Sequence, residues 1–401
     1  MRLYLLALNP TDSVTEGFLP AARELGLRVT VLTDRPEAHQ DAAGRPGAAE
    51  YEVLACDVRD FRAVISRISA HHRPDAVFTN SDHLQTQAAL AAGYFELPAK
   101  SWQAALRTKD KAEMRRRLAA SGLDTLWSAE LPADGGPAEL TALPVPYPCV
   151  VKPREGVASE DVFLATSPAE LARRCAEIRA RRPSAALVVE EYLPGELHTL
   201  ETLGDGRVRH VLGGFRTELS APPYFVEERM AYVPAPPEPV VAQVLARLDA
   251  LGVGLGACHT EFTVHAGRAR IVEVNYRAIG DQCDLLLARL LGIPLFAHIL
   301  RVHLGEPLPA DLGARKDRRA RLAYPCAERA GMLTAAPGPA DLSADGVELT
   351  YRPLREVGER RELHRTNRDF LGVARAIGPD QASVDRAVDG FLAAQRWEIT
   401  P

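Results

Sequence analysis

The stretch that most constrains the fold of this chain is residues 260–277, with the sequence TEFTVHAGRARIVEVNYR. Residues 261–264 and 269–275 are short runs of strand-forming residues, and Ala266 and Gly267 separate them. Two such runs around a glycine-containing turn predict an antiparallel β-hairpin. We therefore expect a sheet that contains this hairpin.

One face of the hairpin is expected to be polar. Because residues two apart on a strand share a face, Glu273, Asn275 and Arg277 should point the same way. Val272 and Val274 should then point into the opposite, apolar layer.

A second acid joins this polar face from the partner strand, which begins at Glu261. Carboxylate and amide oxygens are the ligands of Mg²⁺ when phosphate and water complete its coordination. The alternative is a sheet face exposed to water, which is the commoner origin of charges at alternate positions of one strand. Four polar groups of suitable chemistry favour a metal site.

The hairpin resembles the metal-binding end of the ATP-grasp superfamily, in which an H-x-E-F strand is followed by an E-x-N-x-R strand. The matching residues are His259, Glu261, Phe262, Glu273, Asn275 and Arg277. The resemblance implies that Glu261, Glu273 and Asn275 hold Mg²⁺, with Mn²⁺ as an alternative. It also implies that ATP is bound and that Arg277 is catalytic.

The composition excludes several classes of protein. The 401 residues are 46% hydrophobic and 25% charged, as in globular domains, and the net charge of −5 predicts neither nucleic acid nor an anionic membrane as a partner. No apolar run reaches the roughly 20 residues of a membrane span, and residues 1–9 resemble a first strand rather than a signal peptide. Six scattered cysteines indicate free thiols, no zinc site and a cytoplasmic protein.

The first hundred residues predict a βαβ unit, and the resemblance implies that this unit belongs to a small doubly wound parallel sheet. Residues 2–8 and 28–33 are strand-like and flank a helical pattern at 15–25; a helix at 60–70 and a strand at 75–79 follow. The loop after the first strand lacks G-x-G-x-x-G, so this half is not expected to bind a nucleotide. Polar residues at the strand ends are candidates for substrate contacts, or simply for turns and helix caps: Asp12, Ser13, Asn80, Ser81, Asp82 and His83.

Two lysines are the candidates for phosphate binding. Residues 108–122 predict one capped helix ending at a glycine, similar to the D-K-x-x-x-R segment of the superfamily, and this resemblance selects Lys111 over Lys109. Lys152 ends an apolar strand within 145–153, where its charge needs an anion or water. In the superfamily the corresponding V-V-K-P lysine holds ATP phosphates.

A flap over the phosphates is expected at residues 154–162, which read REGVASEDV. Gly156 and Ser159 fit a loop whose backbone amides cover phosphate. Val157, Ala158 and Asp161 stand where the superfamily usually has glycine or small residues. Glu160 and Asp161 would also repel phosphate, so a different hold or a weaker grip on the nucleotide is expected.

The strand at 185–193 resembles the hinge of the superfamily that receives adenine. The resemblance assigns this contact to the side chain or backbone of Glu190 and to the amides around Glu191 and Leu193. His198 is the candidate for the ribose or phosphates, with Glu196 as its rival. The alternative for Glu190 and Glu191 is an exposed strand end.

Substrate contacts are expected from a Pro-rich aromatic loop and from the start of a helix. Residues 222–227, PPYFVE, resemble a segment of amino-acid-ligating ATP-grasp enzymes, which makes Glu227 a candidate. Packing of the loop by its own aromatic residues is equally compatible with the pattern. Asp281 follows Arg277 closely enough to contact a substrate amine, or it simply caps the helix predicted at 284–291.

The resemblance implies a fold of the α/β and α+β type in four parts. They are an N-terminal Rossmann-like domain (1–105), ATP-grasp subdomain A (106–188), subdomain B with the metal site (189–308) and a small C-terminal α+β lid (309–401). A homodimer is left open.

The implied reaction is ligation of a small carboxylate, such as an amino acid of secondary metabolism, to an amine through an acylphosphate, giving ADP and phosphate. The alternatives are a bicarbonate-using carboxylase, a purine-pathway ligase, and a protein that binds nucleotide without turnover.

Overall fold

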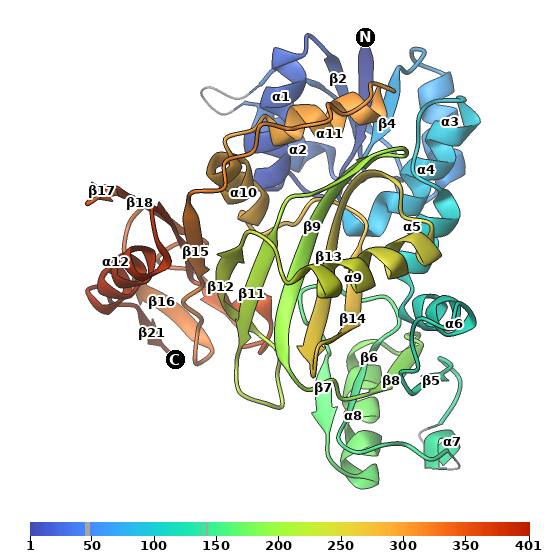
Figure 1. Ribbon diagram of the computed structural model, residues 1–401, viewed down its shortest axis with the longest axis vertical. Helices are drawn as coiled ribbons and strands as arrows, with labels where there is room; N and C mark the ends of the chain where they lie inside the picture. Colours follow the sequence, from blue (N-terminus) through green and yellow to red (C-terminus); the bar gives the residue numbers. More distant parts are fainter. Residues whose placement is uncertain (45–48, 137, 142) are drawn as a thin grey trace.

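A computed structural model describes residues 1–44, 49–136, 138–141 and 143–401 of the chain. The chain begins with a parallel sheet in the order β3-β2-β1-β4, whose strands β2 and β4 are labelled near the N-terminus in Figure 1. The strands are β1 (Arg2–Leu6), β2 (Arg28–Thr33), β3 (Glu52–Ala55) and β4 (Ala76–Phe78). The helices are η1 (Ser13–Phe18), α1 (Leu19–Glu24), α2 (Pro36–Ala43), α3 (Phe61–Ser69), η2 (Asp82–Leu84) and α4 (Gln85–Tyr94). The predicted doubly wound sheet is confirmed. The sequence analysis missed α2 and β3, since only two residues of β3 are even half-buried.

Alternation along β1 divides the N-terminal domain into two apolar layers. Leu3 and Leu5 pack with Phe18 of η1 on one face, whereas Tyr4 packs with Ile68 of α3 on the other. Because helices cover both faces of the sheet, a ligand can reach this domain at the carboxyl ends of its strands.

The largest sheet within the described residues has ten strands, in the order β14-β13-β9-β11-β12-β15-β20-β18-β17 with β10 paired to β9. Its first part comprises β9 (Glu196–Asp205), β10 (Arg209–Val211), β11 (Gly214–Leu219), β12 (Glu227–Val233), β13 (Leu255–His265) and β14 (Arg268–Asn275). Helix α9 (Glu238–Leu251) packs its apolar side against the outer face of the hairpin β13–β14. The hairpin therefore lies at the edge of the sheet with one covered face.

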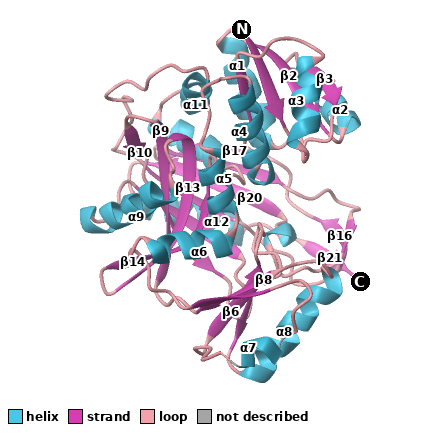
Figure 2. Cartoon of the chain, turned by 90° about the vertical axis from the view of Figure 1, so that its right-hand side faces the viewer, coloured by secondary structure: helices cyan, strands magenta, loops and turns pink. Residues whose placement is uncertain are grey.

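A smaller sheet, β5-β8-β6-β7, lies beyond the hairpin (Figure 2). It comprises β5 (Ser128–Leu131), β6 (Cys149–Pro153), β7 (Phe163–Ala165) and β8 (Leu187–Glu191), with α8 (Pro168–Arg181) packed against it and α7 (Ala138–Thr141) nearby. The helix predicted at 108–122 is in fact two helices, α5 (Trp102–Lys109) and α6 (Lys111–Ala120). Asp110 separates them because its extended backbone lets its carboxylate cap the amides of Ala112 and Glu113, both at 3.0 Å.

The C-terminal segment extends the large sheet. Strand β15 pairs antiparallel with β12, so hydrogen bonding runs across the boundary predicted at 308/309. The elements are β15 (Arg319–Ala323), β16 (Gly331–Ala335), β17 (Ala340–Ala344), β18 (Val347–Pro353), β19 (Arg360–Arg361), η3 (Asn367–Asp369), β20 (Gly372–Gly378), α12 (Gln381–Ala393) and β21 (Glu398–Thr400). Strands β16, β19 and β21 form a separate small sheet.

The predicted hairpin is present, but a bulge changes one of its faces. Ala266 and Gly267 have φ values of 47° and 74°, as a tight hairpin turn requires. Glu261 pairs with Glu273, whereas Phe262 pairs with Ile271, so Val272 is left between two pairs. The expectation that Val272 points into the apolar layer is therefore wrong: it lines a cavity, and Ile271 takes its place in the core.

The helices α10 (Cys283–Leu291) and α11 (Leu295–His303) pack between the N-terminal domain and the large sheet. Among the described residues, no single helix is long and apolar enough to cross a membrane; α10 and α11 reach that length and composition only as a pair bent by 104°.

A first prediction concerns the close approach of β9 to the segment before β13. A Cβ atom on Gly204 would overlap the carbonyl oxygen of Gly254. We expect Gly204→Ala to lower the free energy of unfolding by about 1–3 kcal/mol, the usual range for overpacking. Urea unfolding followed by circular dichroism measures this effect.

The matched control is Gly390→Ala in α12, where an added Cβ meets nothing within 4 Å. Because glycine loses more conformational freedom on folding than alanine, Gly390→Ala should raise the free energy of unfolding by about 0.5–1 kcal/mol. Equal effects of the two substitutions would contradict the close approach of the strands.

Candidate functional site

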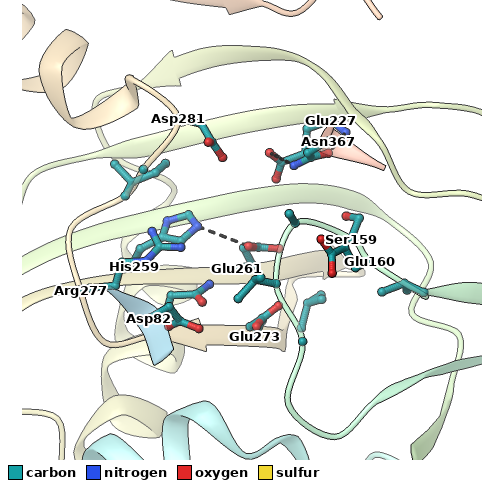
Figure 3. A pocket seen from close by; sticks show the side chains of 18 of the residues that line it. Asp82, Ser159, Glu160, Glu227, His259, Glu261, Glu273, Arg277, Asp281 and Asn367 are labelled. Atoms are coloured by element: carbon teal, nitrogen blue, oxygen red, sulfur yellow. Dashed lines mark hydrogen bonds and ion pairs between the residues drawn. The ribbon is translucent and has the colours of Figure 1, made fainter. Parts of the chain in front are cut away.

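A cavity of about 620 Å³ lies where the N-terminal sheet, the small sheet and the hairpin meet (Figure 3). It is lined by residues from every part of the chain, among them Asp12, Asn80, Asp82, Lys111, Lys152, Ser159, Glu190, Leu193, Glu227, Glu261, Glu273, Asn275, Arg277, Asp281 and Asn367. Most of the candidates selected from the sequence thus surround one space.

The acid end of the hairpin is the chemical centre of this cavity. Glu261 and Glu273 are direct partners in the register of β13 and β14. Lys111 Nζ, at the start of α6, donates to Glu273 Oε1 at 2.9 Å. Burial opposes the charge of Lys111, but Glu273 raises its pKa above the ordinary value.

His259 carries a second compensating charge, which the sequence analysis did not assign. It lies 2.7 Å from Glu201 Oε1 through Nδ1 and 3.3 Å from Glu261 Oε1 through Nε2 (Figure 3). Burial alone would lower the pKa of His259, but Glu201 and Glu261 raise it to about 10. The imidazolium in turn lowers the pKa of Glu261 against the effect of burial.

The H-x-E spacing was the available signal for His259, because residues two apart share a strand face. The buried acid at Glu201, which fixes the charge state, lies 58 positions away. Pairing across β9 and β13 brings it there.

Asn275 and Arg277 lie at the end of β14. Asn275 is buried, and its carbonyl accepts from the Arg277 amide at 2.7 Å, which turns the chain. Arg277 Nη1 donates to the Ala278 carbonyl at 3.0 Å. Within the described part of the chain Arg277 makes no ion pair, so its charge is free for a ligand in the cavity.

Lys152 and Glu190 belong to a buried network at the other wall. Lys152 Nζ lies 2.7 Å from Glu190 Oε2, and Arg115 donates to both Glu190 oxygens at 2.7 and 3.1 Å. Asp124 lies 3.3 Å from Arg115. Burial would raise the pKa of Glu190, but the positive charges of Arg115 and Lys152 lower it to about 2. Burial lowers the pKa of Lys152, although the negative charge of Glu190 opposes this effect.

This network limits the adenine contacts expected from the hinge. Both oxygens of the Glu190 carboxylate are already paired with Arg115 and Lys152. The amide of Glu191 donates to the Trp127 carbonyl at 3.1 Å. The side chain of Glu191 pairs with Arg270 at 2.5 Å. Leu193 lines the cavity, and its role toward adenine stays a prediction.

His198 does not line the cavity, so this geometry does not support its expected contact with nucleotide, which stays a prediction. It pairs with Phe262 across β9 and β13 and stacks on its ring at 5.9 Å, on the face opposite Glu261. Its neighbour Leu197 lines the cavity instead. The sequence shows that His198 follows a turn, but the pairing register of β9 and β13 decides which face of the sheet its side chain lies on.

The flap is built differently from the expectation. Ala158, Ser159 and Asp161 have φ values of 55–58°, so non-glycine residues adopt the left-handed conformation there. Asp161 accepts from Arg181 and Arg182 at 2.6–2.8 Å, and Glu160 forms ion pairs with Arg182 and Arg368. The expected repulsion of phosphate by these two acids is therefore offset by three arginines.

The remaining end of the cavity is acidic and has few compensating charges. Burial, with Glu261 and Asp281 nearby, raises the pKa of Glu227 to about 8. The surrounding protein, which displaces bulk water, also raises the pKa of Asp281, although Arg277 opposes it. Helix capping was the alternative for Asp281, but Gln282 takes the N-cap position of α10.

The donor set at the hairpin fits a hard divalent cation. Glu261 and Glu273 each use Oε1 for a neighbouring cation, and Oε2 of each makes no hydrogen bond to the described residues. Within the same residues, no group of three or more His, Cys, Asp or Glu side chains is spaced to hold a metal alone. Two carboxylates and one amide suit Mg²⁺, which takes its other ligands from phosphate and water.

Comparison with known proteins agrees with this geometry. Residues 145–285 match the family described as ATP-grasp domain. The L-amino acid ligase from Bacillus licheniformis superposes with a TM-score of 0.82 at 19% identity, over 100% of this chain and 99% of that chain.

Two further structures are similar at 15% identity. Phosphoribosylglycinamide synthetase from Anaerococcus prevotii has a TM-score of 0.72 over 100% of this chain and 99% of its own. Biotin carboxylase from Campylobacter jejuni has a TM-score of 0.71 over 99% of this chain and 92% of its own. No curated protein matches the sequence of this chain. At these identities the likeness shows a shared fold.

A second prediction tests the buried network. Because the pKa of Glu190 is about 2 in the folded protein and ordinarily 4.5, its ionised form stabilises the fold above pH 4.5. This contribution is lost as the pH falls from 4.5 toward 2. Glu190→Gln should lower the free energy of unfolding by about 3–5 kcal/mol at pH 7, since Arg115 and Lys152 lose their counter-charge.

Urea unfolding at a series of pH values measures this effect, and the gap between wild type and variant should narrow below pH 4.5. Glu177→Gln is the control, because Glu177 pairs with arginines on the surface of α8 and should cost less than about 1 kcal/mol. A gap that stays constant down to pH 3 would contradict the assigned pKa.

Proposed function

We propose that this chain, whose residues 145–285 match the ATP-grasp domain family, is a ligase that uses ATP to join an amino acid or related small carboxylate to an amine. The observation that carries the proposal is the convergence of Lys111, Glu261, Glu273 and Arg277 on one cavity. A polyphosphate and a carboxylate are both anions, and only a site with several cations can hold them together.

The proposed reaction has two steps. A carboxylate oxygen of the first substrate attacks the γ-phosphorus of ATP, and the bond from this phosphorus to the β–γ bridging oxygen breaks. An acylphosphate forms and ADP is released. The nitrogen of the amine then attacks the acyl carbon, the bond to the phosphate oxygen breaks, and the nitrogen loses a proton. The products are an amide, ADP and phosphate.

Residues of this chain have distinct tasks in that sequence. Lys111 and Lys152 neutralise phosphate oxygens, and the amides of the flap around Ser159 cover them. Arg277, which has no other ion pair among the described residues, stabilises the charge that develops on the phosphoryl and acyl oxygens. Mg²⁺ or Mn²⁺, held by Glu261, Glu273 and Asn275, would supply charge neutralisation at the polyphosphate.

The acid end favours an α-amino acid as the activated carboxylate. Arg277 can face the carboxylate while Asp281 and Glu227 face an ammonium group. Met230 and Ile279 supply an apolar wall for a side chain. Bicarbonate has neither an ammonium group nor a side chain, so these residues favour the amino acid over a carboxylase reaction.

The alternative of nucleotide binding without turnover loses the observation that motivated it. That alternative rested on repulsion between phosphate and Glu160 and Asp161, both of which are paired with arginines. The likeness of the fold to an L-amino acid ligase supports the proposal, and a homodimer stays a prediction.

A third prediction tests Arg277. Arg277→Ala should retain binding of Mg·AMP-PNP, because Lys111 and Lys152 remain, but lose ligation by about 10²–10³ in rate. Phosphate release over a panel of amino acids, with and without bicarbonate, measures turnover, and calorimetry measures nucleotide binding.

Arg229→Ala is the control, since Arg229 lies on β12 with a side chain that is 52% exposed. Unchanged turnover in Arg277→Ala would refute the assigned role, and turnover that requires bicarbonate would favour the carboxylase.

A fourth prediction concerns the ammonium contact. Asp281→Asn should raise KM for the best amino acid of the panel about tenfold or more, because a charge-assisted hydrogen bond is lost, and leave KM for ATP unchanged. An analogue that lacks the amino group should bind wild type and variant equally. The control is Asp311→Asn at an exposed loop, and a KM increase for the analogue as well would contradict the contact.

A further inference from the structure

The C-terminal segment enters the cavity through one short turn, residues 364–369. Asp369 is 2% exposed and accepts from the amides of His364 at 3.1 Å and Arg365 at 2.5 Å. Thr366 and Asp369 form a capping box, and Arg355 lies 3.5 Å from Asp369. The turn is therefore fixed by its own buried carboxylate, and the position of Asn367 with it.

Asn367 contacts Glu227 twice. Its Oδ1 accepts from the Glu227 amide at 3.1 Å, and its Nδ2 donates to Glu227 Oε2 at 3.1 Å. Figure 3 shows the two side chains together at the wall of the cavity. Arg365 also lies over the ring of Tyr224, 5.7 Å from its centroid, on the same loop. The amide side chain of Asn367 thus fixes both the position of the Glu227 backbone and the orientation of the Glu227 carboxylate.

The same turn holds the phosphate flap. The Asn367 amide donates to the Ala158 carbonyl at 3.4 Å, and Arg368 forms an ion pair with Glu160. The side chain of Glu160 is 14% exposed, whereas that of Arg368 is 62% exposed. The flap is therefore docked on the C-terminal turn, through a backbone contact and a partly buried acid.

We propose that Asn367 is a positioning residue that orients Glu227 toward the amino acid and that, with Arg368, couples this orientation to closure of the flap. The proposal deepens the proposed function and rests on it for the identity of the two ligands. Because one turn contacts both sites, each ligand should favour the turn position that the other needs. Nucleotide and amino acid should then strengthen each other's binding by the same factor.

The first experiment needs no substrate. Hydrogen–deuterium exchange of the full-length protein without ligand should show faster exchange of the Glu227 amide in Asn367→Ala and of residues 154–162 in Arg368→Ala. Asn367→Asp keeps the acceptor for the Glu227 amide and loses the donor to its carboxylate, so this amide should stay protected. Arg360→Ala is the control, because Arg360 is exposed on the small C-terminal sheet, where it donates to the Pro401 carbonyl at 2.9 Å.

The second experiment separates positioning from folding. Asn367→Ala and Asn367→Asp should both raise KM for the amino acid roughly tenfold, the size of one hydrogen bond. KM for ATP should change less in these variants than in Arg368→Ala. In wild type the amino acid should lower the Kd of Mg·AMP-PNP, and in Arg368→Ala this effect should disappear.

The inference is overturned if the Asn367 variants change KM for the amino acid no more than Arg360→Ala does. It is equally overturned if exchange in the flap is unchanged in Arg368→Ala, or if the amino acid still lowers the Kd of Mg·AMP-PNP in that variant. Should wild type turn over no amino acid in the panel, the proposed function fails, and the exchange experiment still decides whether the turn holds Glu227 and the flap.

Discussion

Two carboxylates that face each other across one pair of strands impose the main constraint on this molecule. Glu261 and Glu273 are register partners, and their mutual repulsion must be offset wherever the chain folds. Lys111 and His259 offset it within the protein, and His259 stays charged because Glu201 lies behind it. The hairpin therefore depends on residues that lie outside it.

This demand for cations explains how the parts of the chain are arranged. Asp110 breaks a helix so that Lys111 starts α6 beside the hairpin, and β6 ends with Lys152 in the opposite wall. Arg277 follows β14 and forms no ion pair with an acidic side chain among the described residues. The cavity is lined by the acids of the hairpin and Asp281 and also by Lys111, Lys152 and Arg277, which suits anionic phosphates next to a zwitterion.

Local patterns predicted a large part of this. The alternation of residues along the two β-runs predicted the hairpin and placed Glu261, Glu273 and Asn275 together. The apolar runs of the first hundred residues predicted the strands of the parallel sheet. Local patterns could not predict long-range register. A bulge turned Val272 into the cavity, and pairing with Phe262 turned His198 away from it.

Charge compensation was also invisible in the sequence, because partners lie far apart along the chain. Glu160 is offset by Arg182 and Arg368, and Glu227 is held by Asn367, 140 positions later. The C-terminal segment carries no sequence motif, and its contribution comes only from the place where the turn at 364–369 meets the cavity.

The central claim, that a divalent cation joins nucleotide phosphates to the acid end of the hairpin, has one direct measurement. Crystals grown with Mn²⁺ and a non-hydrolysable ATP analogue give an anomalous signal at each bound metal. We predict a peak about 2 Å from carboxylate oxygens of both Glu261 and Glu273 and next to the phosphates. Nucleotide bound in the cavity with no peak at these carboxylates would contradict the account.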